Sequence, residues 1–307
     1  MSNTASYSVA VVGGTGGLGV HISHAFLTDF RSSFHTVRIL TRDTSSATAQ
    51  ELSAKGAKLH KLDESDLPRT LDEAFEGIDV IVNVLAGQGP DEVKQAVLDA
   101  AARSDVKVYF LNEFGSDHKI NDFPGYEHPG WLGKQKAATE TRKVLSGRKV
   151  IALYPSLFLE FATTVMGIDL EKNTYLCYGS PNQKLSVTAR VDIGRAVARL
   201  AILALAPDTA SKVPDEVRIA GATTTYEEIR DTVARAKGVP KAEITVKDLK
   251  QLKDSIRRDP GKNFFDYLNV VVGEGKADFS SGNANDLVNP GETYWKWKTV
   301  EDHVRSL

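Results

Sequence analysis

Hydrophobic positions in the first half of the chain follow two spacings. Short, nearly continuous apolar runs are typical of strands buried on both faces, and apolar residues every three or four positions are typical of helices. The runs predict strands over residues 7–12, 37–41, 57–62, 80–85, 106–111 and 149–153. The helical spacing predicts helices over residues 17–29, 47–55, 67–75, 90–103 and 134–145. This alternation predicts an α/β fold, a doubly wound parallel sheet with right-handed crossovers.

The alternation loosens after about residue 155. The pattern there predicts helices over residues 192–205, 225–236 and 246–256, a loop over 271–290, and a final strand and helix in the tail. Thr225 and Glu228 have the spacing of a capping box. We therefore expect a sheet domain over residues 1–155 and a smaller, mainly helical substrate domain over residues 156–307, parts of which return to the sheet.

Composition and charge narrow the function classes. The chain has 307 residues, of which 41% are hydrophobic, and a net charge of −2 without a block of like charges, so neither nucleic acid nor a membrane surface is an expected partner. No leader pattern and no apolar run of about 18 residues is visible, so we expect a cytoplasmic protein. A single cysteine, Cys177, and the isolated pair His21 and His24 predict no metal site. The oligomeric state stays open.

A glycine-rich turn follows the first predicted strand and opens the first predicted helix. Glycines in such a turn allow unusual backbone angles and leave room for a pyrophosphate, which the helix start binds through free N–H groups and its dipole. The spacing is that of the dinucleotide fingerprint, so we predict a Rossmann domain. The residues expected to contact the cofactor here are Gly13, Gly14, Thr15, Gly16, Gly17, Leu18 and Gly19.

The end of the second predicted strand discriminates between cofactors. Arg42 stands where units specific for NAD usually carry an acidic residue, and a guanidinium there can pair with the 2′-phosphate of NADP. Asp43 follows it and favours NAD instead, if its carboxylate turns toward the ribose. We predict NADP(H) as the cofactor, with NAD(H) as the second choice.

Three segments resemble a known family. Residues 37–66 resemble the NmrA-like branch of the atypical short-chain reductases. Residues 110–115, Phe-Leu-Asn-Glu-Phe-Gly, resemble the F-x-P-S-E-F-G signature of the isoflavone reductase and phenylcoumaran benzylic ether reductase subgroup, and residues 294–302 resemble that family's closing segment. The resemblance implies a Rossmann fold, NADPH, small aromatic substrates, and a catalytic lysine that handles a proton.

That lysine must be chosen between two. The tyrosine–lysine pair of ordinary short-chain dehydrogenases is missing, because the residue four positions after Tyr126 is Gly130. The family pattern runs without a gap from Lys136 to Phe158 and fits Lys134 only with a two-residue shift. The resemblance therefore implies Lys136 as the catalytic residue, which also contacts the cofactor. The alternative is that both lysines lie on a solvated helix face.

The resemblance also implies cofactor contacts on later loops. Three of them follow the fourth predicted strand, two follow the fifth, and one lies near the nicotinamide: Ala86, Gly87 and Gln88; Asn112 and Phe114; Phe158. The alternatives are purely structural roles. Residues 86–88 would then form an ordinary glycine turn, and Phe158 would be a core aromatic.

An aromatic loop precedes the lysine helix. Its members Phe123, Tyr126 and Trp131 are candidates for substrate binding, because loops at this face of such a sheet carry recognition. The alternative is hydrophobic packing.

Two departures from the family pattern leave the activity open. Leu111–Asn112 replaces Pro–Ser, and Gln50–Glu51 stands where the reductases carry a second basic residue. The first hypothesis is an NADPH-dependent oxidoreductase that reduces a small aromatic or cyclic substrate. The alternative is a non-catalytic NAD(P)-binding redox sensor that acts through a protein partner.

Overall fold

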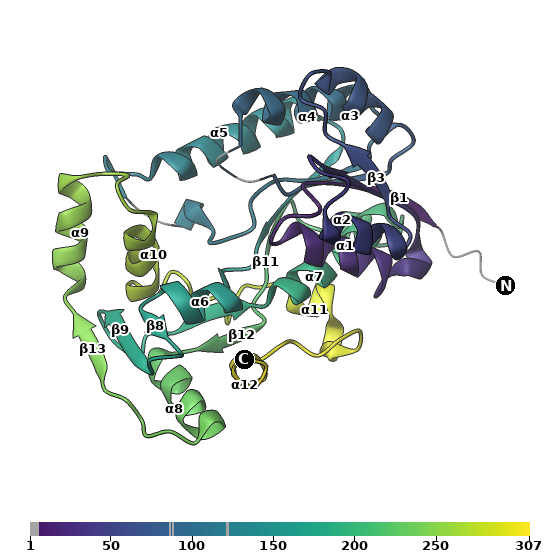
Figure 1. The fold of residues 1–307 in the computed structure, drawn as a ribbon. Helices are drawn as coiled ribbons and strands as arrows, with labels where there is room; N and C mark the ends of the chain where they lie inside the picture. Colours follow the sequence, from purple (N-terminus) through teal and green to yellow (C-terminus); the bar gives the residue numbers. More distant parts are fainter. Residues whose placement is uncertain (1–5, 86, 88, 121–122) are drawn as a thin grey trace. The chain divides into compact units, whose positions relative to one another are not determined.

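The computed structural model describes residues 6–85, 87, 89–120 and 123–307, and its chain divides into two compact units (Figure 1). Unit 1 comprises Met1–Glu113, Lys134–Leu153 and Ile193–Val217. Unit 2 comprises Phe114–Gly133, Tyr154–Asp192 and Arg218–Leu307.

Unit 1 is built on a seven-stranded sheet with the order β3-β2-β1-β4-β5-β6-β11. Its strands are β1 (Tyr7–Val12), β2 (Phe34–Thr41), β3 (Lys58–Lys61), β4 (Val80–Asn83), β5 (Val108–Phe110), β6 (Lys149–Tyr154) and β11 (Glu216–Arg218). Every pairing from β3 to β6 is parallel. The strand order reverses between β1 and β4, which is the point where doubly wound sheets bind ligands at the carboxyl ends of their strands. The predicted fold class is confirmed.

Helices cover both faces of this sheet. In Figure 1, α3, α4 and α5 lie on one face, and α1, α2 and α7 lie on the other. Their bounds are α1 (Gly19–Leu27), α2 (Ala47–Ala54), α3 (Leu67–Phe75), α4 (Asp91–Arg103), α5 (Pro129–Val144) and α7 (Arg190–Leu205). Helix α5 begins five residues earlier than predicted, because Pro129 suits a first turn and the His128 ring nitrogen Nδ1 accepts the Gly130 N–H at 3.1 Å.

Unit 2 contains two small sheets, with the orders β12-β10-β7 and β13-β9-β8. The strands are β7 (Leu157–Phe158), β8 (Ile168–Asp169), β9 (Thr174–Tyr178), β10 (Leu185–Thr188), β12 (Ala222–Thr224) and β13 (Ile244–Lys247). The helices are α6 (Leu159–Val165), α8 (Tyr226–Lys237), α9 (Leu249–Arg258), α10 (Phe264–Gly273), α11 (Asn285–Val288) and α12 (Val300–Arg305). Short 3₁₀ helices occur at Arg31–Ser33, His118–Ile120, Ala210–Lys212 and Pro290–Glu292 along the chain.

The structure differs from three expectations for the second half. The predicted helix over residues 246–256 is strand β13 followed by α9, whose first turn is capped by the Asp248 carboxylate accepting the Gln251 N–H at 3.0 Å. The tail has no strand at residues 294–299, and Thr299 caps α12 through a complete capping box. The predicted loop over 271–290 contains α11 and the end of α10.

The capping prediction for the helix over 225–236 is confirmed, since Thr225 Oγ1 accepts the Glu228 N–H at 3.1 Å at the start of α8. Within the described residues, every helix is too short or too polar to cross a bilayer.

Candidate functional site

The glycine turn after β1 folds more tightly than any larger residue allows. Gly13 has a φ of +83°, and a Cβ there would lie 2.9 Å from the Val84 carbonyl oxygen. A Cβ on Gly19 would lie 2.1 Å from the Gly13 carbonyl oxygen. Both contacts are with backbone, which cannot move aside, so the turn and the start of α1 require glycine at these two positions.

The outer side of the same turn is open. Gly16 and Gly17 are exposed, and α1 begins after Leu18 without a side-chain cap. Its first N–H groups and its positive dipole end therefore suit an anion. Thr15 Oγ1 lies 2.8 Å from Thr41 Oγ1, which links the turn to the end of β2. These features fit the pyrophosphate of a dinucleotide.

Arg42 follows β2 directly and is exposed. In the described part of the chain, no ion pair or hydrogen bond engages its guanidinium. Asp43, in contrast, has its carboxylate bound to Ser45, and these hydrogen bonds hold the pKa of Asp43 below its usual value. The Gln50 side-chain amide donates to the Thr44 carbonyl at 2.7 Å. The loop thus presents an unpaired cation at the place where a 2′-phosphate is predicted.

Polar side chains tie together the loops after β4 and β5. The Asn83 amide donates to the Tyr109 hydroxyl at 3.0 Å, and the Leu85 N–H donates to Asn83 Oδ1 at 3.2 Å. The Asn112 amide donates to the Leu85 carbonyl at 2.5 Å. Burial raises the pKa of Tyr109 to about 12, so its hydroxyl stays protonated. This network fixes the carboxyl edge of the sheet beside the switch point.

The loop after β4 is described only in part. Gly87 is exposed, and its carbonyl accepts a hydrogen bond from Lys94 Nζ of α4 at 2.9 Å. Ala86 and Gln88 lie outside the described residues. The predicted cofactor contacts of these three residues stay predictions.

The two candidate lysines lie on different faces of α5. Successive residues in a helix are rotated by about 100°, so Lys134 shares a face with the buried residues Ala138 and Thr141, and Lys136 lies about 200° away. Lys136 is exposed, as is its neighbour Ala137. The buried face of the helix therefore carries Lys134 toward the sheet.

Lys134 meets a buried carboxylate there. Its Nζ lies 3.9 Å from Glu113 Oε2, and the exposed side-chain fractions are 33% for Lys134 and 3% for Glu113. Burial lowers the pKa of Lys134, and the negative charge of Glu113 opposes that shift. Glu113 follows β5 by three residues, so the pair lies at the same carboxyl edge as Asn112. An amine with a shifted pKa at the carboxyl edge of such a sheet is a candidate for proton transfer.

The aromatic loop belongs to unit 2, and its three aromatic side chains are buried there. Phe123, Tyr126 and Trp131 pack around Tyr267, whose hydroxyl donates to the Tyr126 carbonyl at 2.6 Å. This aromatic packing is a sufficient structural role for the three residues, and it requires no ligand. Their predicted substrate contacts stay predictions. Phe114 is also buried in unit 2, whereas Phe158 ends β7 half-buried, and their predicted cofactor contacts are likewise untested.

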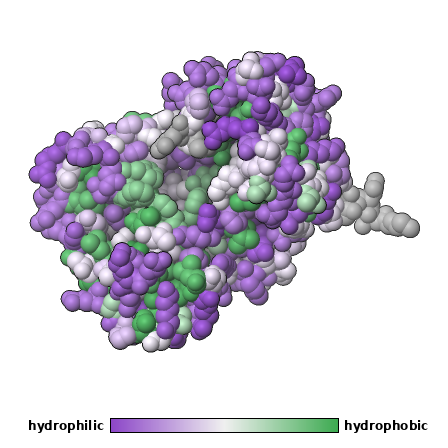
Figure 2. Space-filling view, viewed as in Figure 1, coloured by the Kyte–Doolittle hydropathy of each residue, from purple (hydrophilic) through white to green (hydrophobic). Residues whose placement is uncertain are grey.

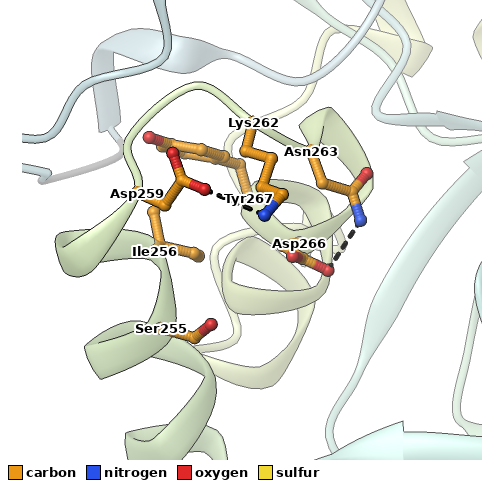
Figure 3. Close-up of a pocket in the computed structure, with 7 residues that line it drawn as sticks. All are labelled: Ser255, Ile256, Asp259, Lys262, Asn263, Asp266 and Tyr267. Carbon is orange, nitrogen blue, oxygen red and sulfur yellow. Dashed lines mark hydrogen bonds and ion pairs between the residues drawn. The ribbon is translucent and has the colours of Figure 1, made fainter.

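Unit 2 has other surface features. Figure 2 shows hydrophobic side chains gathered on the face of unit 2 in view, and the exposed large apolar residues of this unit include Phe264 and Phe265. A small polar cavity of about 60 Å³ lies between α9 and α10 (Figure 3). Lys262 pairs with Asp259 at its edge, at 3.0 Å. A cavity of that size holds about two water molecules, too little for a dinucleotide.

Sequence reasoning missed the ion pair because it followed an ungapped motif match. The helical period offered another signal, since Lys134 precedes Ala138 by four and Thr141 by seven positions. Among the described residues, no three histidine, cysteine, aspartate or glutamate side chains gather as a metal site requires.

Comparisons with known proteins agree with this fold. Among curated proteins, no sequence matches the chain. The isoflavone reductase structure is similar with a TM-score of 0.75 at 20% identity, over 98% of this chain and 99% of that one. The leucoanthocyanidin reductase–NADPH complex from Vitis vinifera gives a TM-score of 0.76 at 17% identity, over 97% and 98%.

A third similar structure is that of a protein described as a regulator and not as a reductase. NmrA, a negative transcriptional regulator in complex with NADP, gives a TM-score of 0.70 at 19% identity, over 98% of this chain and 95% of that one. At these identities the likeness shows the fold. The model of the NmrA-like family matches residues 5–304, which confirms the resemblance noted in the sequence, and the protein belongs to the NmrA-like family.

Proposed function

We propose that the protein is an NADPH-dependent oxidoreductase of a small aromatic or cyclic substrate, with Lys134 as the residue that transfers the proton. The observation that carries this proposal is the ion pair of half-buried Lys134 with buried Glu113 at the carboxyl edge of the sheet. Two solved relatives, isoflavone reductase and the leucoanthocyanidin reductase–NADPH complex, are reductases by name.

The cofactor side of the proposal rests on the glycine turn and on Arg42. The uncapped start of α1 and the exposed backbone of Gly16 and Gly17 suit the pyrophosphate. The unpaired guanidinium of Arg42 suits the 2′-phosphate. A bound reduced nicotinamide would supply the hydride. The chain's own residues would then have to hold the dinucleotide and provide a proton.

Lys134 is suited to provide that proton. Burial brings its pKa down from the value of a free lysine, which makes the ammonium a better acid near neutral pH. Glu113 favours the protonated form, so the proton is retained until it is needed. Asn112 holds the neighbouring loop through the Leu85 carbonyl. We therefore propose Lys134 in place of Lys136, which lies on the exposed face of α5.

A matched pair of variants tests the role. Lys134→Ala is expected to lower kcat by at least about 100-fold, the usual contribution of a positioned proton donor, and to leave the Kd for NADPH unchanged. Lys136→Ala, on the same helix, should keep both values within about twofold. The assay follows NADPH oxidation over a panel of small aromatic and cyclic unsaturated compounds, with NADPH binding measured by calorimetry. Full activity of Lys134→Ala would overturn the assignment.

A second function, that of a non-catalytic sensor of the dinucleotide's redox state, has one observation in its favour. Gln50 stands where the reductases carry a second basic residue, and its amide is used to close the turn at Thr44. The NmrA regulator was solved with NADP. This function predicts NADPH binding without turnover over the whole panel, and a protein partner whose affinity changes with the cofactor's redox state.

A further inference from the structure

The loop after β2 contains a carboxylate that is already engaged. Asp43 Oδ1 accepts a hydrogen bond from the Ser45 N–H at 2.8 Å and another from the Ser45 hydroxyl at 2.6 Å. Asp43 is the acidic residue that an NAD-specific unit would turn toward the ribose hydroxyls. In this protein the carboxylate faces along the chain to Ser45 instead.

Other contacts hold the loop in that arrangement. The Asp43 N–H donates to Thr41 Oγ1 at 3.4 Å, and the Ser46 hydroxyl donates to the Asp43 carbonyl at 3.1 Å. Thr41 in turn contacts Thr15 of the glycine turn. The orientation of Asp43 is therefore tied on one side to α2, which Ser46 caps, and on the other side to the turn that would hold the pyrophosphate.

The Asp43 carboxylate is engaged by Ser45, and among the described residues no ion pair or hydrogen bond engages the Arg42 guanidinium. A carboxylate near the 2′-position binds ribose hydroxyls and repels a phosphate, whereas a guanidinium binds the phosphate. Resting on the proposed function, we propose that Ser45 is a positioning residue that sets the preference for NADPH over NADH by holding the Asp43 carboxylate away from the ribose.

The test is a double-mutant cycle on dinucleotide affinity. The variants are Ser45→Ala, Asp43→Asn and the combination of both, and the readout is the Kd of the full-length protein for NADPH and for NADH by calorimetry. Ser65→Ala is the matched control, because Ser65 binds Asp63 Oδ1 through the same N–H and hydroxyl pair after β3.

The proposal predicts a specific pattern. Ser45→Ala removes the hydroxyl donor and keeps the N–H donor, so the Asp43 carboxylate is held by one hydrogen bond in place of two. The NADPH preference should then fall by up to about tenfold, in line with the loss of one charge-assisted hydrogen bond. Asp43→Asn should keep or increase the preference, and the combined variant should regain it, since no carboxylate remains to be held. Ser65→Ala should leave the preference unchanged, and all four variants should keep the wild-type melting temperature.

Two results overturn the proposal while leaving NADPH binding intact. One is an unchanged preference in Ser45→Ala. The other is a combined variant as weak for NADPH as Ser45→Ala, because Ser45 would then contact the phosphate itself. A wild-type protein that binds neither dinucleotide would overturn this proposal and the proposed function together.

Discussion

Removing the charge of Glu113 should move the titration of Lys134 to lower pH. Glu113→Gln keeps the size of the side chain and removes the negative charge 3.9 Å from Lys134 Nζ. Burial already lowers the pKa of Lys134, and Glu113 is the group that opposes it. The substitution leaves burial without an opposing charge, so the pKa of Lys134 must fall further.

The size of the shift follows from the distance and the exposure. Two unit charges about 4 Å apart interact by about 4 kcal/mol at an effective dielectric constant of about 20 and by about 1 kcal/mol in water. One pKa unit corresponds to about 1.4 kcal/mol, so the limits are roughly 0.8 and 3 units. Lys134 keeps 33% of its side chain exposed, and solvent screens the pair accordingly. We expect a downward shift of about 1–2 units.

The titration can be measured without knowing the substrate. Lysines labelled with ¹³C-methyl groups are followed by NMR over pH, and the Lys134 signal is identified by its loss in Lys134→Ala. Glu140→Gln on the exposed side of α5 is the control and should leave that signal's midpoint in place. Once a substrate is found, the alkaline limb of the rate profile should move down by the same amount. A Lys134 midpoint in Glu113→Gln that stays at or above the wild-type midpoint would refute the reasoning.

Three further predictions concern stability. Gly19→Ala should lower the free energy of unfolding by about 2 kcal/mol or more, because its Cβ would lie 2.1 Å from the Gly13 carbonyl oxygen. A variant that unfolds in urea near the wild-type midpoint would contradict this. Thr225→Ala should lower the free energy of unfolding, measured in urea, by about 1 kcal/mol, because it removes the acceptor of the Glu228 N–H. Thr225→Ser keeps a hydroxyl acceptor and should retain most of the stability. Burial lowers the pKa of His303, so the folded state favours the neutral ring and stability should fall as pH drops below about 6.5, the unfolded value. His303→Gln should lose less unfolding free energy than the wild type between about pH 7.5 and 5. If the variant and the wild type lose the same amount, His303 does not cause the acid destabilisation.

Local patterns predicted most of unit 1 because its central strands β1, β4, β5 and β6 are buried on both faces. The strand over 7–12 and the helix over 67–75 have the predicted bounds. Strand β13 was missed for the opposite reason, since Val246 is 53% exposed and carries no burial signal. Its partner is β9, about seventy residues earlier in the chain. A strand that depends on such distant pairing cannot be recognised from its own residues.

Some features of the candidate site could likewise be predicted from the sequence, and others could not. The glycine turn and Arg42 are local features whose chemistry can be predicted from spacing alone. The state of Asp43 could not be predicted, because it depends on which of several nearby donors its carboxylate meets. The choice between Lys134 and Lys136 depended on helix phase, and a motif aligned by residue identity does not record which face of a helix is buried.

The placement of Lys134 favours the reductase over the sensor. Ion pairs that lose solvent contribute little to stability, and apolar residues of similar size often serve as well. The chain nevertheless keeps an amine and a buried carboxylate at the carboxyl edge of the sheet, where Asn112 fixes the adjoining loop. A protein that only bound the dinucleotide would need the glycine turn and Arg42, but nothing in such binding requires an amine whose pKa is lowered. In the proposed reduction such an amine would donate the proton, and Glu113 would keep it charged until then.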